Sequence, residues 1–114
     1  MNKPFDKEEV LNILINHIGA KNAASAGELV REITSSDSNA VSERLLRYKI
    51  RDLRLDGFHV CAHPATGYYM AANEAELNKT CEFLYDRAMA SLTQVSKMKR
   101  ISLPDLRGQL QLLS

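Results

Sequence analysis

The first apolar pattern along the chain has the period of a helix. Apolar residues recur on one side of that helix: Val10, Leu11, Leu14, Ile15 and Ile18. Asp6 precedes them, with Glu9 three positions later as in a capping box, and Gly19 follows them. The pattern therefore predicts a first helix that is capped by Asp6 and closed by Gly19, with this apolar face buried.

A second capping box, formed by Ser25 and Glu28, opens a shorter helix. Its predicted inward face consists of three apolar residues: Leu29, Val30 and Ile33. Serine, threonine, aspartate and asparagine then dominate the stretch from Thr34 to Ala40. Because such side chains bond to their own backbone in turns, this stretch is predicted to be a loop, longer than the turn of a compact helix-turn-helix.

The third helix has two different faces. An apolar stripe repeats along one face: Leu45, Leu46, Ile50, Leu53 and Leu55. A basic and aromatic row repeats at three and four positions and is expected to face solvent: Arg44, Arg47, Tyr48 and Arg51. Ser42 is the expected N-cap. Asp56 and Gly57 end the helix, because glycine accepts the left-handed conformation of a C-cap.

After this helix the spacing changes to that of a strand. The face expected to lie against a core consists of alternate residues: Phe58, Val60 and Ala62. The opposite face consists of the residues between and after them: His59, Cys61 and His63. Pro64 and Gly67 predict a turn over residues 63–67, and Tyr68–Met70 is rich in strand formers. The segment is therefore predicted to be a β-hairpin.

A basic helix that runs directly into a hairpin predicts an α+β, mainly helical fold of the winged helix-turn-helix type. Three helices form its core and the hairpin forms its wing, over residues 1–72. Asn73 and Glu76 then begin a long C-terminal helix that is predicted to run to about Lys99. That is about 25 residues, or roughly 38 Å at about 1.5 Å per residue, which is more than a small core needs to cover it.

A heptad-like seam runs along this helix, over residues 73–100. Its members alternate at four and three positions: Leu77, Cys81, Leu84, Ala88, Ser91, Val95 and Met98. The small side chains of Ala88 and Ser91 weaken the seam. The first half of the helix is expected to pack on the domain and the second half to pair with another copy, through Leu84, Ala88 and Val95.

Residues 101–114 are predicted to be a tail or a docking peptide. Pro104 interrupts the segment, which is richer in leucine than disordered tails usually are. Its leucines are the predicted contacts with a protein partner: Leu103, Leu106 and Leu110. The alternative is that the segment folds back on its own domain.

Composition narrows the class of protein. A chain of 114 residues, 45% hydrophobic and 25% charged, is ordinary for a globular domain with one modest core. The net charge of +1 excludes a polycation that coats nucleic acid, so any basic surface must be local and weak. The start has no secretory pattern and the two cysteines are far apart, which predicts a cytoplasmic protein with reduced thiols.

Three stretches of the chain resemble winged-helix proteins encoded by bacteriophages and prophages. They are Gly19–Ala23 followed by a helix, Arg51–Cys61, and Gly67–Ala71 leading into a long helix. The resemblance covers most of residues 10–98. It implies binding of duplex DNA in the control of transcription or replication, with the third helix in the major groove. The extended Ser35–Ala40 loop departs from the family's compact pattern.

By that resemblance, the basic row of the third helix occupies the reading positions: Arg44, Arg47, Tyr48 and Arg51. The wing tip lacks lysine and arginine, so wing contacts are limited to His63, Thr66 and backbone amides. Arginine suits both tasks of a reader, because its planar fork bonds guanine O6 and N7 together and also clamps phosphates.

Other residues of the third helix have secondary roles in this prediction. Tyr48 would bond a phosphate or touch a thymine methyl group. Glu43 would accept from a cytosine amine, or act only on the helix dipole, and Ser42 completes the predicted DNA contacts. Lys49 and Arg54 are peripheral. The opposing interpretation of the whole row is a solvated basic face.

Metal binding and catalysis find little support in the sequence. His59, Cys61 and His63 share one face of a strand, but alternate side chains lie nearly 7 Å apart at about 3.3 Å per residue. A structural zinc site also needs four ligands. No nucleophile elbow, glycine-rich phosphate loop or carboxylate pair with a helical histidine is present. We therefore predict no metal, no cofactor and no enzymatic activity.

Two functions stay open at this point. The first is a dimeric regulator that binds double-stranded DNA. The second is a non-enzymatic adaptor that keeps the winged-helix scaffold and binds a protein partner through the long helix and tail. The near-neutral charge and the uncharged wing favour the adaptor, and the salt dependence of binding would distinguish the two.

Overall fold

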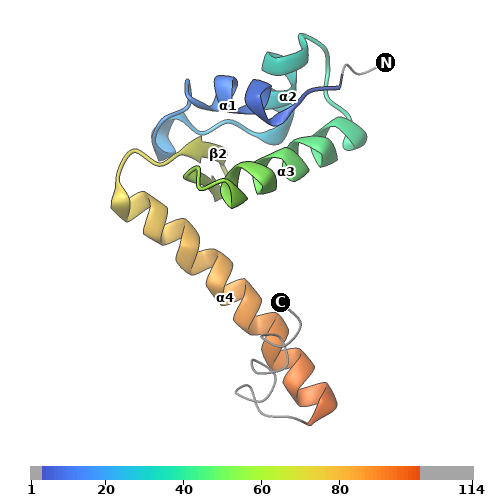
Figure 1. The fold of residues 1–114 in the computed structure, drawn as a ribbon, viewed down its shortest axis with the longest axis vertical. Coiled ribbons are helices and arrows are strands. Elements are labelled where there is room, and N and C mark those ends of the chain that lie inside the picture. The colour runs from blue at the N-terminus through green and yellow to red at the C-terminus, as the bar shows by residue number, and fades with distance from the viewer. Residues whose placement is uncertain (1–3, 101–114) are drawn as a thin grey trace. The chain divides into compact units, whose positions relative to one another are not determined.

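The computed structural model describes residues 4–100, and these form helices and one β-hairpin (Figure 1). In chain order the elements are α1 (Lys7–Leu14), η1 (Ala20–Asn22, a 3-10 helix), α2 (Ala26–Thr34), α3 (Ala40–Leu55), β1 (Val60–His63), β2 (Gly67–Met70) and α4 (Glu74–Lys99). The predicted α+β, mainly helical class is confirmed. The chain divides into two compact units between Thr80 and Cys81, so the first turns of α4 belong to the first unit.

α1 and α2 begin at the positions that their capping boxes predict. The Asp6 carboxylate accepts from the amide of Glu9 at 2.9 Å, and the Ser25 hydroxyl accepts from the amide of Glu28 at 3.2 Å. Each glutamate accepts in return from the amide of its cap residue. None of the helices in the described part of the chain combines the length and the apolar character that a membrane span requires.

α1 ends at Leu14, more than a turn before the predicted end. The amide of Met70 donates to the carbonyl of His17, and the amide of Gly19 donates to the carbonyl of Met70, each at 2.8 Å. This pairing with β2 draws the segment out of the helix, because its backbone groups bond to a strand instead. The predicted burial of two apolar residues is therefore wrong, since each is 52% exposed: Ile15 and Ile18.

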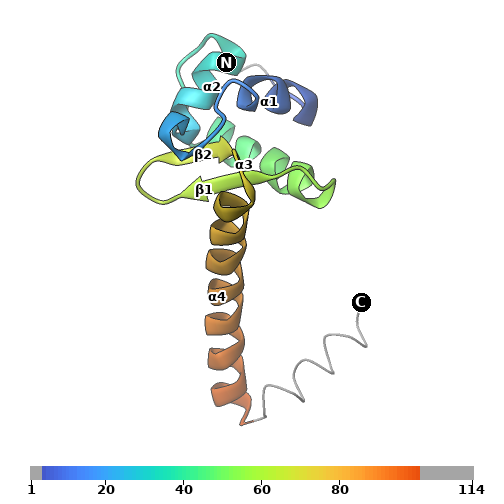
Figure 2. The same ribbon diagram turned by 90° about the vertical axis from the view of Figure 1, so that its left-hand side faces the viewer.

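β2 is paired on both of its edges. On one edge it runs antiparallel to β1, with Cys61 opposite Tyr69 (Figure 2). On the other edge, Ala24 and Tyr68 exchange both backbone hydrogen bonds, at 2.8 and 2.9 Å. The hairpin is therefore fastened to the segment between α1 and α2, far away in sequence.

Gly67, the first residue of β2, is required by this fastening. Its φ is +106°, a backbone conformation that residues with a side chain rarely adopt. A Cβ atom at this position would also collide with the carbonyl of Ala24. The turn and the close approach of the two segments therefore both depend on glycine.

The outer edge of β1 is already occupied at Val60. Val60 lies opposite Met70, but the amide and carbonyl of Met70 bond to His17 and Gly19, so the backbone groups of Val60 and Met70 point away from each other. The Val60 amide donates to the carbonyl of Phe58 at 3.0 Å. The Val60 carbonyl accepts from Nε of Arg54 at 2.8 Å. Both outward-pointing groups of this residue have partners within the chain.

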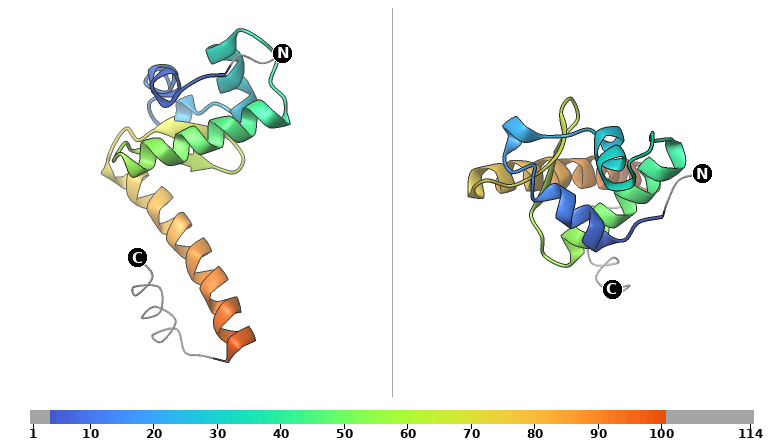
Figure 3. Two further views of the ribbon diagram at one scale, coloured as in Figure 1. Left: turned by 45° about the vertical axis from the view of Figure 1, so that its right-hand side comes forward. Right: turned by 90° about the horizontal axis from the view of Figure 1, so that it is seen from above.

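The core lies among α1, α2, α3 and the hairpin; α1 and α2 cover one side of α3 and of the hairpin (Figure 3). Its fully buried members come from all three helices: Val10, Leu14, Leu29, Val30, Leu46, Ile50 and Leu53. The apolar stripe predicted for the third helix is confirmed apart from its last residue. Leu55 is 78% exposed, because at about 100° per residue it lies about 180° around the helix from buried Leu46.

The hairpin is buried on two faces, not one as predicted. Val60 is in the core, yet the next residue, Cys61, is 0% exposed. The first turns of α4 cover that second face: Sγ of Cys61 donates to the carbonyl of Glu76 at 3.6 Å, and buried Tyr69 hydrogen bonds to Thr80. Phe58, predicted to lie in the strand and against the core, precedes β1 and is 41% exposed.

Candidate nucleic-acid interface

α3 begins earlier than the sequence pattern suggests. Its N-cap is Asn39, and the loop before it spans residues 35–39, within the predicted range of 34–40. The Asn39 side chain accepts from the amide of Ser42, and the Ser42 hydroxyl accepts from the amide of Asn39, each at 2.9 Å. The prediction of Ser42 as N-cap is therefore wrong. Ser42 is 3% exposed and closes the cap from inside the first turn.

The structure places the four predicted reading residues together on the exposed face of α3. All four side chains are exposed: Arg44, Arg47, Tyr48 and Arg51. The buried residues Leu46, Ile50 and Leu53 lie on the opposite side of the same helix. Packing of that apolar side fixes which way the helix is turned, so the basic row is presented to solvent.

Arg51 and Tyr48 form one unit on this face. The guanidinium carbon of Arg51 lies over the Tyr48 ring, 5.2 Å from its centroid. A cation over an aromatic face is attracted by the ring quadrupole, by about 0.5–1 kcal/mol at an exposed site. Arg51 also lies 3.6 Å from the carboxylate of Asp52. The guanidinium is therefore restrained in position while its side chain stays 63% exposed.

Glu43 has partners of its own at the start of α3. Its carboxylate accepts from the hydroxyl of Ser38 at 3.0 Å and lies 3.9 Å from the guanidinium of Arg47. An exposed pair at this spacing contributes about 0.3–0.5 kcal/mol, so Arg47 can leave it for a stronger anion. Glu43 links the loop to the helix, and this arrangement favours its structural role over the reading of a base.

The two residues predicted to be peripheral differ from the row in exposure. Arg54 is half-buried and its Nε donates to the carbonyl of Val60, so this side chain connects α3 to β1. Lys49 is also half-buried. Neither belongs to the exposed face that the other four residues form.

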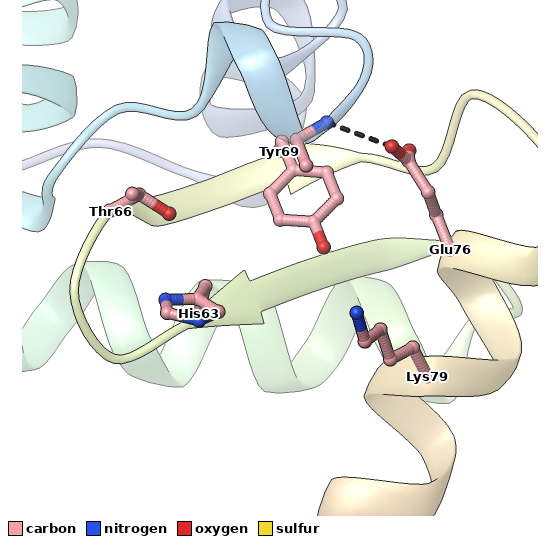
Figure 4. Close-up of a pocket in the computed structure, with 6 residues that line it drawn as sticks. His63, Thr66, Tyr69, Glu76 and Lys79 are labelled. Atoms are coloured by element: carbon pink, nitrogen blue, oxygen red, sulfur yellow. Dashed lines mark hydrogen bonds between the residues drawn. The ribbon is translucent and has the colours of Figure 1, made fainter.

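Beside the turn of the hairpin, which was predicted to be a wing, lies a lysine that the sequence did not connect with it. His63 and Thr66 are exposed at the turn, where Nδ1 of His63 accepts from the amide of Ala65 at 3.1 Å. Lys79 of α4 points toward the same hairpin (Figure 4). A cavity of about 280 Å³ is lined by residues of the hairpin, α4 and η1: Ala20, His63, Thr66, Tyr69, Glu76 and Lys79.

Glu76 contributes a negatively charged carboxylate to the lining of this cavity, and hydrogen bonds hold that carboxylate in place. Its two carboxylate oxygens accept from the amides of Ala72 at 2.9 Å and Ala20 at 3.0 Å. These two backbone hydrogen bonds, the Ala72 one the larger effect, hold the pKa of Glu76 below its usual value. The carboxylate is thus engaged by amides and ties α4 to η1, which leaves Lys79 as the solvent-facing charge of the cavity.

The three residues weighed as zinc ligands do not form a joint site. Cys61 is buried beneath α4, whereas His59 and His63 are exposed. Over residues 4–100 there is no group of three or more histidine, cysteine, aspartate or glutamate side chains that could hold a metal ion.

The predicted dimer residues lie on α4. Leu84 is 40% exposed, Ala88 is exposed and Val95 is half-buried. The predicted partner contacts in the tail lie outside the described residues: Leu103, Leu106 and Leu110. Comparison of the chain with protein-family models, curated proteins and solved structures gives no match.

Proposed function

We propose that this chain is a winged helix-turn-helix protein that binds double-stranded DNA in the cytoplasm. α3 would enter the major groove, and the hairpin would act as the wing. The element order supports this fold: three helices, a hairpin, and a segment between α1 and α2 that pairs with β2. By resemblance, its role would be to control transcription or replication of a phage-type element.

The observation that carries the proposal is the exposed basic row of α3. Arg44, Arg47 and Arg51 lie on one face of a 16-residue helix whose other face is locked in the core. A helix fits the major groove, and a bidentate arginine contact to guanine is the commonest specific contact there. Arg51 is already restrained by Tyr48, so less side-chain entropy is lost when it binds.

The wing supports the proposal through Lys79. DNA affinity comes largely from phosphate contacts, and the turn of the hairpin contains no lysine or arginine. Lys79, with the hydroxyl of Thr66 and the imidazole of His63, gathers donors beside that turn. These three side chains would bond the DNA backbone next to the bases that α3 reads.

The test is binding of the full chain to DNA at several salt concentrations. Fragments of the protein's own genetic neighbourhood are titrated by fluorescence anisotropy, with excess competitor DNA. We expect a competitor-resistant complex on one fragment whose affinity falls steeply with salt. Arg47→Ala should weaken it by about 1–3 kcal/mol if the residue reads a base. Arg87→Ala on α4 is the matched control and should bind normally. If the unmodified chain shows no salt-sensitive complex, the proposal is wrong.

A second candidate function is a protein-binding adaptor on the same scaffold. It is favoured by the exposed apolar side chains of α4, which include Phe83 at 43% and Tyr85 at 61% exposure. Such an interaction would change little with salt, because burial of apolar surface is not screened by ions. Deletion of residues 101–114 would abolish partner binding by the tail and leave DNA binding largely intact.

A further inference from the structure

The second unit of the chain contains an unusually exposed apolar seam. From Cys81 onward the seam residues of α4 are solvent-exposed, apart from half-buried Val95: Cys81, Leu84, Ala88, Ser91 and Met98. Leu84 is 40% and Met98 77% exposed. A regular alternation of three- and four-residue steps is the spacing with which one helix packs against another.

Charge is segregated along the same helix. Every acidic residue of α4 lies in its first half: Glu74, Glu76, Glu82 and Asp86. The second half carries only basic charges, on Arg87, Lys97 and Lys99. A parallel pair of such helices would place like charges side by side. An antiparallel pair places each acidic half beside a basic half and also opposes the two helix dipoles.

We propose that α4 pairs with the α4 of a second copy of this chain in an antiparallel coiled coil. The seam consists of the a and d positions of the heptad, and in an antiparallel pair each a residue lies opposite a d residue of the partner. One register pairs all the seam residues from Cys81 to Met98 in this way. Cys81 then faces the partner's Met98, Leu84 faces the partner's Val95, and Ala88 faces the partner's Ser91. Each contact occurs twice because the pair is two-fold symmetric.

Side-chain size fits this register. The centre of the interface consists of Ala88 and Ser91 from both copies, which are small and let the two backbones approach closely. Larger residues flank the centre on both sides, with Leu84 against Val95 and Cys81 against Met98. In the same register Glu82 of each copy comes level with the partner's Lys97. The small residues that weaken a seam of large side chains are therefore compatible with a close antiparallel contact.

The oligomeric state of the full chain is the first test, and it is measured without DNA by sedimentation equilibrium. We expect a dimer that Leu84→Ser weakens at least tenfold. Phe83→Ser is the matched control, because Phe83 has nearly the same exposure, 43% against 40%, but lies outside the seam. A chain that stays monomeric at high concentration, or a dimer that both variants weaken equally, would overturn the proposal.

Cysteine cross-linking tests the orientation, since Cys81 is an exposed thiol in the seam. Diamide oxidises two facing thiols to a disulfide and is itself reduced to the hydrazine. The antiparallel register predicts no cross-link in the unmodified chain and a dimeric product in Met98→Cys. That product should be lost when Cys81→Ser is added. Efficient cross-linking of the unmodified chain through Cys81 would indicate a parallel pair, and no product from Met98→Cys would reject the register.

Discussion

The guanidinium of Arg51 lies over the ring of Tyr48, one turn earlier on α3, with 5.2 Å between the guanidinium carbon and the ring centroid. Tyr48 is 51% exposed, so the ring serves as a platform at the surface instead of a core residue. The pair restrains an arginine on the face that would meet DNA. The contribution of Tyr48 to binding can therefore be separated into its ring and its hydroxyl.

Replacement of Tyr48 provides that separation. Tyr48→Ala removes the platform and should weaken DNA binding several-fold, since loss of a cation–π contact of about 0.5–1 kcal/mol is a factor of roughly two to five. Tyr48→Phe keeps the ring and should retain most of the affinity. Fluorescence anisotropy at fixed salt measures both. Equal losses in the two variants would assign the contribution to the hydroxyl and a direct phosphate contact.

Lys79 should contribute to the salt dependence of DNA binding. Each phosphate contact adds about 0.9 to the magnitude of the slope of log K against log salt concentration, so Lys79→Gln should reduce that slope by about this amount on every sequence. Lys7→Gln, at an exposed lysine that begins α1 and lies outside the cavity, the basic row and α4, is the control and should leave the slope unchanged. If the chain binds DNA and Lys79→Gln has the same slope as the unmodified chain, Lys79 does not contact a phosphate. That result would leave the proposed binding by α3 in place.

Stability should fall as pH rises from the ordinary pKa of histidine through the raised pKa of His17. Burial alone would lower the pKa of His17, but its hydrogen bonds to Glu32 at 2.9 Å and to the carbonyl of Asn22 at 2.8 Å, with the charge of Glu32, outweigh it and raise the pKa. A raised folded-state pKa stabilises the fold fully below the unfolded pKa of about 6.5, and that stabilisation is lost as pH rises through the folded value.

Urea denaturation at several pH values measures this dependence. The free energy of unfolding should decrease in the unmodified chain as pH rises above about 6, the range in which the unfolded histidine begins to lose its proton. Glu32→Gln keeps a hydrogen-bonding side chain but removes the negative charge, so its decrease should be smaller. An identical pH profile in the two proteins would show that the His17–Glu32 pair does not contribute.

Two glycines with positive φ allow two costs of an added side chain to be measured separately: backbone strain, and a steric clash with a neighbouring segment. Gly57 has a φ of +96° with nothing within 4 Å of an added Cβ, whereas at Gly67 the added atom would meet the carbonyl of Ala24. Gly57→Ala should therefore destabilise by about 1–2 kcal/mol, the cost of a left-handed residue with a side chain. Gly67→Ala should cost clearly more, about 3 kcal/mol or above, because the strand must also move. Similar losses in thermal unfolding would argue against the close approach.

Local signals in the sequence predicted most of the helices. The capping boxes of α1 and α2 and the start of α4 depend on residues three positions apart, so they can be read directly from the sequence. The basic row of α3 is likewise a matter of helical spacing. At the start of α3, Asn39 and Ser42 are both good caps, and the prediction chose the inner partner of a reciprocal pair.

What the sequence did not predict depends on contacts between distant segments. Ile15 and Ile18 have a helical spacing, but Met70 competes for the backbone of residues 17–19. Cys61 alternates with core residues, yet it is buried because α4 returns over the hairpin. Lys79 and Thr66 are on different elements, and no pattern in the sequence links them. They line one cavity because α4 packs against the hairpin.

The bond from Arg54 to the carbonyl of Val60 has a consequence for solubility. An open strand edge is a template on which other chains can add strands, and this is a route to aggregation. At β1 the arginine side chain occupies the carbonyl that an incoming strand would need, and Phe58 occupies the neighbouring amide. An arginine next to the basic row of α3 therefore also occupies a strand edge at which copies of the chain could otherwise pair.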